Sequence, residues 1–239
     1  MTSLSYDNSL INLKSLIGSL FNFIFTIARI FLVEPNIIYI GDSHAHFLFK
    51  NKKIKRFSMK DGSKLIIWLG PMLLYTVSRD GFKLNKKVRI ILRIANNKQP
   101  IVIILGEIDC RVHFVNKTLT LGIKEFDNIA YGYKKFVISL INTYSLTKAI
   151  IIAPFPPSNL GLDNTKFPRN GSISERVLVT EMITESLLRI SSSQFIVINC
   201  SPMISIKNGS LNEKYTDDGV HLNFLGSKKI IDKIDFENM

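Results

Sequence analysis

Five short apolar runs place strong limits on the fold of this chain. They are rich in Ile, Leu and Val, and they lie at residues 37–40, 65–69, 101–105, 149–153 and 195–198. Such runs are typical of strands buried on both faces, as in a parallel sheet covered by helices. Residues 123–144 and 174–190 have helical patterns and lie between the later runs. The alternation predicts an α/β protein with a doubly wound sheet of five parallel strands.

The length and composition suit one folded domain. The chain has 239 residues, of which 46% are hydrophobic, and this is enough for an ample core. We find no internal repeat, second domain or long linker in the sequence. We expect a hydrophobic helical segment over residues 1–35 and a single α/β domain over residues 36–239.

Two short sequences supply a nucleophile and its base. Gly-Asp-Ser-His at 41–44 directly follows the first apolar run, and Asp-Gly-Val-His at 218–221 lies near the end of the chain. Ser43 is thereby expected at the carboxyl end of a strand, where α/β sheets carry their ligand-facing loops. A serine hydroxyl needs a base to take its proton, and a third group must hold that base in one tautomer. Asp218 and His221, three residues apart, can reach each other and fill these two roles.

These sequences resemble the SGNH (GDSL-like) hydrolase family, which has its serine in a Gly-Asp-Ser after the first strand and an Asp-x-x-His near the C-terminus. The resemblance covers about residues 37–224. It implies a three-layer α/β/α fold of flavodoxin-like layout, with ester hydrolysis or acyl transfer through an acyl-serine at Ser43. It also includes Asp42, for which we expect a structural role as acceptor for the backbone N–H groups of the turn. The larger α/β-hydrolase fold is disfavoured because its Gly-x-Ser-x-Gly elbow is absent.

The resemblance further implies an oxyanion hole built from the ends of neighbouring strands. A glycine after the second strand corresponds to Gly70, whose backbone N–H would act beside that of Ser43. The block after the third strand is usually Gly-x-Asn-Asp, but here Ile108 replaces the asparagine, between Glu107 and Asp109 and after Gly106. An isoleucine donates no hydrogen bond, and loss of one such donor typically costs about 3 kcal/mol of transition-state stabilisation.

Arg111 is the substitute donor that we expect, ahead of Cys110 and His113. Glu107, Asp109 and Arg111 would alternate on one side of an extended continuation of the strand and hold one another in place. The alternative is that these three side chains form a structural ion-pair cluster beneath the site.

The positive charge is concentrated in one segment. The formal net charge is +12, and residues 50–98 contain 14 Lys or Arg against Asp61 and Asp80, which accounts for all of it. A helix predicted over 82–97 has basic residues on one side, with Ile90 and Ile94 among them. This pattern suits an anionic membrane surface or another acidic partner, and the alternative is a solvated basic face whose isoleucines are covered by a loop. Nucleic acid is disfavoured because no binding motif is found.

The N-terminal segment is apolar from residue 10 to residue 33, with Lys14 and Arg29 as interruptions. The uncharged stretch between them has 14 residues, fewer than the 20 or so that usually cross a membrane. The start also lacks the basic region and cleavage site of a signal peptide. We favour a helix that packs on the domain or lies in a membrane interface over a single-pass anchor. The expected location is therefore cytoplasmic, with peripheral membrane association as an option.

The remaining candidates are minor. Asp217 could orient His221 in place of Asp218, and His44 either contacts the leaving group or starts a helix, which we favour. His44 and His46 have no metal-site spacing, and we predict no metal and no cofactor. The two cysteines follow different strands, which favours a reduced intracellular protein.

The sequence predicts a serine esterase that removes acyl groups, with acetyl as the favoured group, from a glycan or small lipid. Transfer to a sugar hydroxyl, or a binding module that has lost turnover and works through its basic surface, are the alternatives.

Overall fold

The computed structural model describes residues 4–49, 55–60, 63–81, 84–95, 99–160 and 168–238. Side chains are described throughout these ranges except at 4–14, 47, 117–121, 123 and 236–238. Five lysines of the basic segment lie outside the described residues, namely Lys50, Lys52, Lys53, Lys83 and Lys98.

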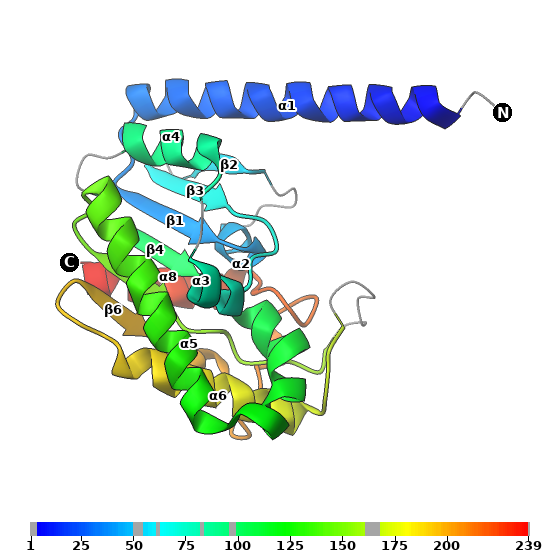
Figure 1. Ribbon diagram of the computed structural model, residues 1–239, viewed down its shortest axis with the longest axis vertical. Coiled ribbons are helices and arrows are strands. Elements are labelled where there is room, and N and C mark those ends of the chain that lie inside the picture. Colours follow the sequence, from blue (N-terminus) through cyan, green and yellow to red (C-terminus); the bar gives the residue numbers. More distant parts are fainter. Residues whose placement is uncertain are drawn as a thin grey trace.

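A six-stranded sheet forms the centre of the molecule, with strand order β2-β3-β1-β4-β5-β6 (Figure 1). Its strands are β1 (Ile37–Gly41), β2 (Phe57–Lys60), β3 (Lys64–Trp68), β4 (Ile101–Ile104), β5 (Ala149–Ile152) and β6 (Phe195–Ile198). The five strands predicted from the apolar runs are present and mutually parallel, so the doubly wound sheet is confirmed. The sixth strand, β2, pairs antiparallel with β3 and was not predicted. It alternates buried and half-buried residues at the sheet edge, so it lacks the continuous apolar run of a central strand.

Helices cover both faces of the sheet, and the three-layer α/β/α fold is therefore confirmed. One face packs against α3 (Leu74–Asp80), α4 (Lys86–Ile94), α5 (Val115–Tyr144) and α6 (Ile173–Arg189). The other packs against α2 (Ser43–Phe47), α7 (Ser201–Ile204) and α8 (Phe224–Asn238). Ile38 and Ile40 join the first core and Ile37 and Tyr39 the second, because successive strand side chains point to opposite faces.

The helices differ from the predicted ones mainly at their ends. Helix α5 begins eight residues before the predicted start at 123, and Gly122 interrupts it with a non-helical backbone at φ 59°. Helix α4 begins after Asn85, whose side chain accepts a hydrogen bond from the N–H of Lys87. Helix α6 begins with a capping box between Ser172 and Glu175.

Helix α1 (Leu4–Leu32) lies across the open edge of the sheet, beside β2 and α4 (Figure 1). The side-chain amide of Asn22 donates to the carbonyl oxygen of Phe57 across 3.0 Å and accepts from its N–H across 3.2 Å. It thus pairs with the backbone of β2 as a further strand would. Because an unpaired edge strand invites aggregation, α1 protects this one.

Candidate active site

The nucleophile candidate Ser43 is the first residue of α2, directly beyond the end of β1. A Cβ atom at Gly41 would collide with the carbonyl oxygen of Ile104, so the close approach of β1 to β4 requires a glycine there. The Asp42 carboxylate caps α2 by accepting from the backbone N–H of His44 across 2.8 Å. This is the turn-stabilising role that the sequence indicates for Asp42.

The structure brings Ser43, His221 and Asp218 together in one hydrogen-bonded chain. Ser43 Oγ lies 2.9 Å from His221 Nε2, and His221 Nδ1 lies 2.7 Å from Asp218 Oδ2. The other Asp218 oxygen accepts the backbone N–H groups of Val220 and His221. Asp217 is bonded to the side chain of Asn223 instead, so Asp218 is the residue that orients His221.

These contacts keep the Asp218 carboxylate ionised. Partial burial alone would raise its pKa, but hydrogen bonds from the His221 ring and from the N–H groups of His221 and Val220 outweigh burial. They hold the Asp218 pKa well below its ordinary value. A carboxylate that stays charged is suited to stabilising a protonated His221.

The turn that carries His221 is fixed by close contacts. Gly219 has a φ of +75°, and a Cβ atom there would collide with the carbonyl oxygen of Leu160. Thr216 accepts the N–H of Gly219 through its hydroxyl, and that hydroxyl donates to the carbonyl oxygen of His221. The imidazole therefore projects from a turn with little freedom to move.

His44 lies at the start of α2, as expected, and it makes contacts that the sequence did not predict. It is 2% exposed, its Nδ1 lies 3.0 Å from Asp42 Oδ1, and its Nε2 lies 3.1 Å from the carbonyl oxygen of Val220. Both partners are acceptors, so both ring nitrogens donate and the ring carries a positive charge. The ring centroids of His44 and His221 are 4.9 Å apart. The Asp-x-His spacing within the turn was the available signal for the Asp42–His44 pair, whereas nothing local in the sequence pointed to Val220.

The pKa of His44 agrees with this geometry. Burial alone would lower it, but the charge of Asp42, its hydrogen bond, the nearby charge of Glu107 and the Val220 carbonyl together raise it. The result is a pKa of about 9 in place of 6.5. A fixed cation therefore lies beside His221 at neutral pH.

The expected extended continuation at 107–111 is wrong. A helical turn begins at Glu107 and continues as a π-helix over Asp109–Phe114. In a helix, residues four apart share a face, whereas residues two apart do not. Arg111 accordingly donates to Glu107 from Nε across 2.6 Å and from Nη2 across 3.1 Å.

Asp109 does not take part in that ion pair. Its two oxygens accept the backbone N–H groups of Leu74 and Tyr75, at 2.7 Å and 3.1 Å, and so cap the start of α3. Burial, only partly offset by these two hydrogen bonds, raises the Asp109 pKa to about 7. The proposed three-member cluster therefore divides into an ion pair, Glu107 with Arg111, and a buried helix cap.

The remaining oxyanion candidates lie at strand ends. Gly70 follows β3 and has a φ of +93°, and Gly106 follows β4 with a φ of +109°. Ile108 is 4% exposed and fills the asparagine position with an apolar side chain. Glu107 Oε2 lies 4.0 Å from His44 Nε2, so the Glu107–Arg111 ion pair is next to His44. The role of Arg111 as an oxyanion donor stays a prediction.

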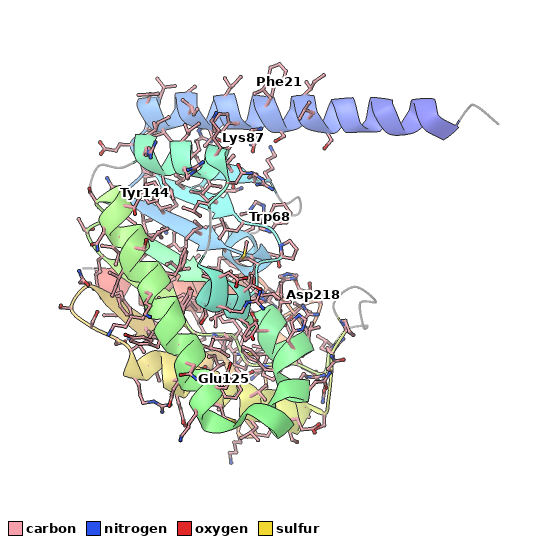
Figure 2. All side chains as sticks on the ribbon, in the orientation of Figure 1. Phe21, Trp68, Lys87, Glu125, Tyr144 and Asp218 are labelled. Carbon is pink, nitrogen blue, oxygen red and sulfur yellow. The ribbon has the colours of Figure 1, made fainter. Side chains whose placement is uncertain are left out.

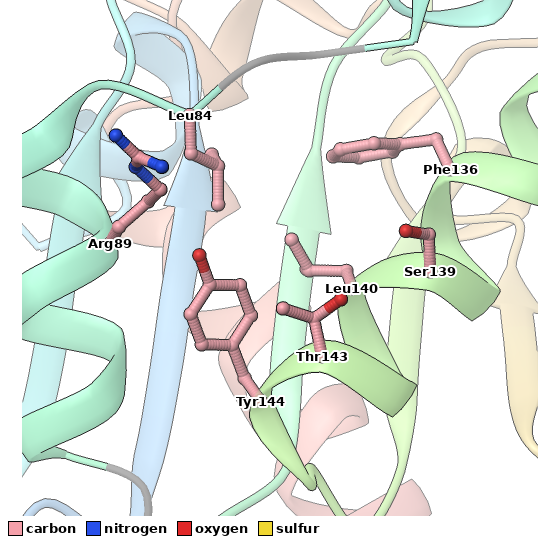
Figure 3. Close-up of a pocket in the computed structure, with 7 residues that line it drawn as sticks. All are labelled: Leu84, Arg89, Phe136, Ser139, Leu140, Thr143 and Tyr144. Atoms are coloured by element: carbon pink, nitrogen blue, oxygen red, sulfur yellow. The ribbon is translucent and has the colours of Figure 1, made fainter.

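Other features lie away from this chain of contacts. A cavity of about 250 Å³ between α4 and α5 is lined by Arg89 and Tyr144 among others (Figure 3). Tyr144 ends α5 shortly before β5 begins, so this cavity is near the amino ends of the strands, whereas Ser43 lies at their carboxyl ends. Cys110 and Cys200 are buried and unpaired, in the two separate cores. Within the described residues, no cluster of His, Cys, Asp and Glu could hold a metal ion.

Comparison with known proteins identifies the fold. No family model matches the chain, and no curated protein sequence is similar to it. A Streptococcus pneumonia protein named for platelet activating factor matches at a TM-score of 0.56 and 15% identity, over 98% of this chain and 99% of its own. The M. smegmatis aryl esterase matches at 0.50 and 12% identity, over 86% and 100%. A GDSL-like lipase from Bacteroides thetaiotaomicron has a TM-score of 0.48 at 17% identity, over 85% and 88%. At these identities the first two similarities show a shared fold.

Proposed function

We propose that this chain, which shares its fold with an aryl esterase, is a serine esterase of the SGNH type. The observation that carries the proposal is the pair of hydrogen bonds that joins Ser43 Oγ to the His221 ring, across 2.9 Å, and the ring to Asp218, across 2.7 Å. The nucleophile and base are 178 positions apart in the sequence, so the fold itself brings them into contact. Both distances lie in the range needed for proton transfer from a nucleophile to a base.

In this mechanism, Ser43 attacks the ester carbonyl while His221 takes its proton. Asp218 stabilises the resulting imidazolium, and the backbone N–H groups of Ser43 and Gly70 stabilise the oxyanion. Collapse of the tetrahedral intermediate expels the alcohol, which receives its proton from His221, and leaves an acyl group on Ser43. A water molecule, deprotonated by His221, then releases the carboxylic acid.

His44 has a positioning role in this proposal. Its bond to the Val220 carbonyl holds the backbone next to His221, and its bonds to Asp42 hold it to the turn that carries Ser43. The nucleophile and the base are therefore fixed relative to each other before substrate arrives. A misplacement of about 1 Å in such a pair can reduce the rate about a hundredfold.

The proposed substrate is an acyl ester of a glycan or small lipid, with acetyl as the acyl group. The acyl-enzyme can pass its acyl group to water or to a sugar hydroxyl, so an O-acyltransferase has the same first step. Adding a sugar acceptor to an acetyl-ester assay separates the two, because an esterase releases one acetate for each alcohol at any acceptor concentration. Transfer instead gives an acetylated sugar whose yield rises with acceptor concentration.

Ile108 favours a second candidate, a binding module without turnover. Its buried apolar side chain provides no oxyanion donor where the resemblance implies an asparagine. Without that donor the reaction would be slowed by a factor on the order of a hundred or more. Such a protein would retain the fold and the basic surface but would not react with an ester at a useful rate.

Labelling with a fluorophosphonate probe tests the enzyme against the binding module. We expect a covalent adduct with the wild type, none with Ser43→Ala, and undiminished labelling of Ser139→Ala, which changes an exposed serine on α5. The probe should be tried from about pH 6 to about pH 9, over which a histidine base becomes neutral. Absence of a Ser43-dependent adduct over that range would rule out the esterase and favour the binding module.

A further inference from the structure

Helix α1 exposes apolar side chains to solvent, whereas an ordinary surface helix exposes polar ones. The face toward the domain packs Phe23, Ile27 and Ile30 on the core. It also contains the Asn22 contacts with β2 and the buried hydroxyl of Thr26, which donates to the Asn22 carbonyl. The face toward solvent is apolar and is made of Leu16, Ile17, Leu20, Phe21, Ile24, Phe25, Phe31 and Leu32. Phe21 is 69% exposed and Leu32 is 82% exposed. An exposed apolar face of this extent marks a site of interaction with an apolar partner.

The arrangement in space makes this face accessible. Figure 2 shows Phe21 on the side of α1 that points away from the body and Lys87 between α1 and α4. Lys87 Nζ lies 3.4 Å from Ser19 Oγ and above the ring of Phe23 at 5.6 Å from its centre. The domain therefore holds α1 along one side only. Residues 15–32 form a helix long and apolar enough to cross a membrane by length and composition, and 11% of them are buried.

Cationic side chains lie near α1 on the neighbouring helix α4, with Arg89 on the side of α4 that faces α5. Lys86, Arg89 and Arg93 are exposed on α4, which lies alongside α1. Ile90 and Ile94, on the same helix, are half-buried, and Ile94 packs against the core. The apolar component of this surface therefore belongs to α1, and α4 supplies positive charge.

A cavity of about 620 Å³ lies between α1 and the sheet edge. Its apolar wall includes Phe25 and Trp68, and its basic wall includes Lys55 and Arg56. Aromatic rings next to paired cations suit an amphiphile with an anionic head group. Trp68 is the last residue of β3 and pairs in register with Gly41. The cavity is therefore near the carboxyl ends of the strands, where Ser43 also lies.

We propose that α1 lies flat in the surface of a bilayer that contains anionic phospholipid, and that the Lys55–Arg56 cavity takes a phospholipid head group. Charge complementarity selects this occupant, since a second copy of the chain would bring one set of cations against another. The Asn22 contacts with Phe57 select the flat orientation, because a helix that crossed the bilayer would have to leave β2. This inference is independent of whether Ser43 is catalytic.

Flotation of the full chain with vesicles tests the proposal. We expect binding to phosphatidylcholine vesicles that contain phosphatidylglycerol, weak binding to phosphatidylcholine alone, and release at high salt. Phe21→Ser with Phe25→Ser should abolish binding. Lys55→Gln with Arg56→Gln should weaken it about thirtyfold, on the basis of about 1 kcal/mol for each cation near an anionic surface.

The matched control is Lys228→Gln with Lys229→Gln, which removes the same charge from exposed positions on α8. It should bind within about twofold of the wild type, because α8 covers the other sheet face. Circular dichroism of every variant shows whether the fold is intact. Equal binding to neutral vesicles, or equal loss in the α8 control and the Lys55–Arg56 variant, would overturn the proposal. Binding to vesicles that only detergent reverses would also overturn it, because that indicates a helix that spans the bilayer. So would a wild type that binds no vesicles and forms a dimer in solution, if Phe21→Ser with Phe25→Ser converts that dimer to a monomer.

Discussion

His44 donates a hydrogen bond from Nε2 to the carbonyl oxygen of Val220, across 3.1 Å and 176 positions of sequence. The turn that carries Ser43 is thereby bonded directly to the turn that carries His221. Because the Asp42 carboxylate occupies the other nitrogen of His44, one buried imidazolium connects the two halves of the candidate site.

Replacing His44 tests that connection. We expect His44→Phe to lower the kcat of ester hydrolysis about tenfold to a hundredfold with little change in KM, since His221 is less well positioned. Steady-state kinetics on an acetyl ester provides the measurement. His113→Phe, which changes a histidine on the π-helix, is the control and should leave kcat within about threefold. Equal effects of the two substitutions would contradict the positioning role.

The stability of the fold should depend on pH through His44. Its pKa is raised from 6.5 to about 9, so the folded state holds the proton more tightly than the unfolded state does. The stabilisation is fully present below pH 6.5 and is lost as the pH rises through about 9. It is on the order of 3 kcal/mol for a buried group with this shift. Urea unfolding at pH 7 and pH 9 should show a fall in the free energy of unfolding, and His44→Phe should show a much smaller one.

Asp109 should contribute to the stability of the fold. It contacts the backbone of α3 and none of the three residues of the proposed Ser43–His221–Asp218 triad. Its two oxygens each accept a backbone N–H of α3, whereas an asparagine has one acceptor oxygen. We expect Asp109→Asn to lower the free energy of unfolding by about 1–3 kcal/mol, as measured by urea denaturation. Asp80→Asn makes the same chemical change at an exposed carboxylate and should have an effect below about 0.5 kcal/mol. Equal stability losses would show that the buried cap is unimportant.

Gly219 should tolerate no side chain. Its positive φ and the adjacent Leu160 carbonyl mean that Gly219→Ala must shift the turn that holds His221. We expect the rate of Ser43 labelling by a fluorophosphonate to fall about a hundredfold. Gly18→Ala, which meets open space on α1, is the control, and its labelling rate should match that of the wild type. Rapid labelling of Gly219→Ala would show that the turn can adapt.

The strands could be predicted from the sequence because each buried parallel strand is a continuous apolar run, and this pattern is local. Strand β2 lacked it, because an edge strand is covered differently on its two faces. The helical turn at 107–111 was missed for a related reason. The charged residues Glu107, Asp109 and Arg111 alternate with uncharged ones, which is compatible with an extended segment. Only the i to i+4 contact between Glu107 and Arg111 revealed the helix.

The sequence by itself determined the parallel strands and the two turns that carry Ser43 and His221, because those features depend on residues close together in the chain. Only the tertiary structure decided which residues from distant parts of the sequence come into contact. The contacts of His44 with Val220, of Asp109 with α3 and of Asn22 with β2 join segments 34 to 176 positions apart. It also decided which face of α1 meets the domain. Asn22 bonds to the open backbone of β2, and Phe23 and Ile30 pack on the core, while Phe21 and Leu32 stay exposed.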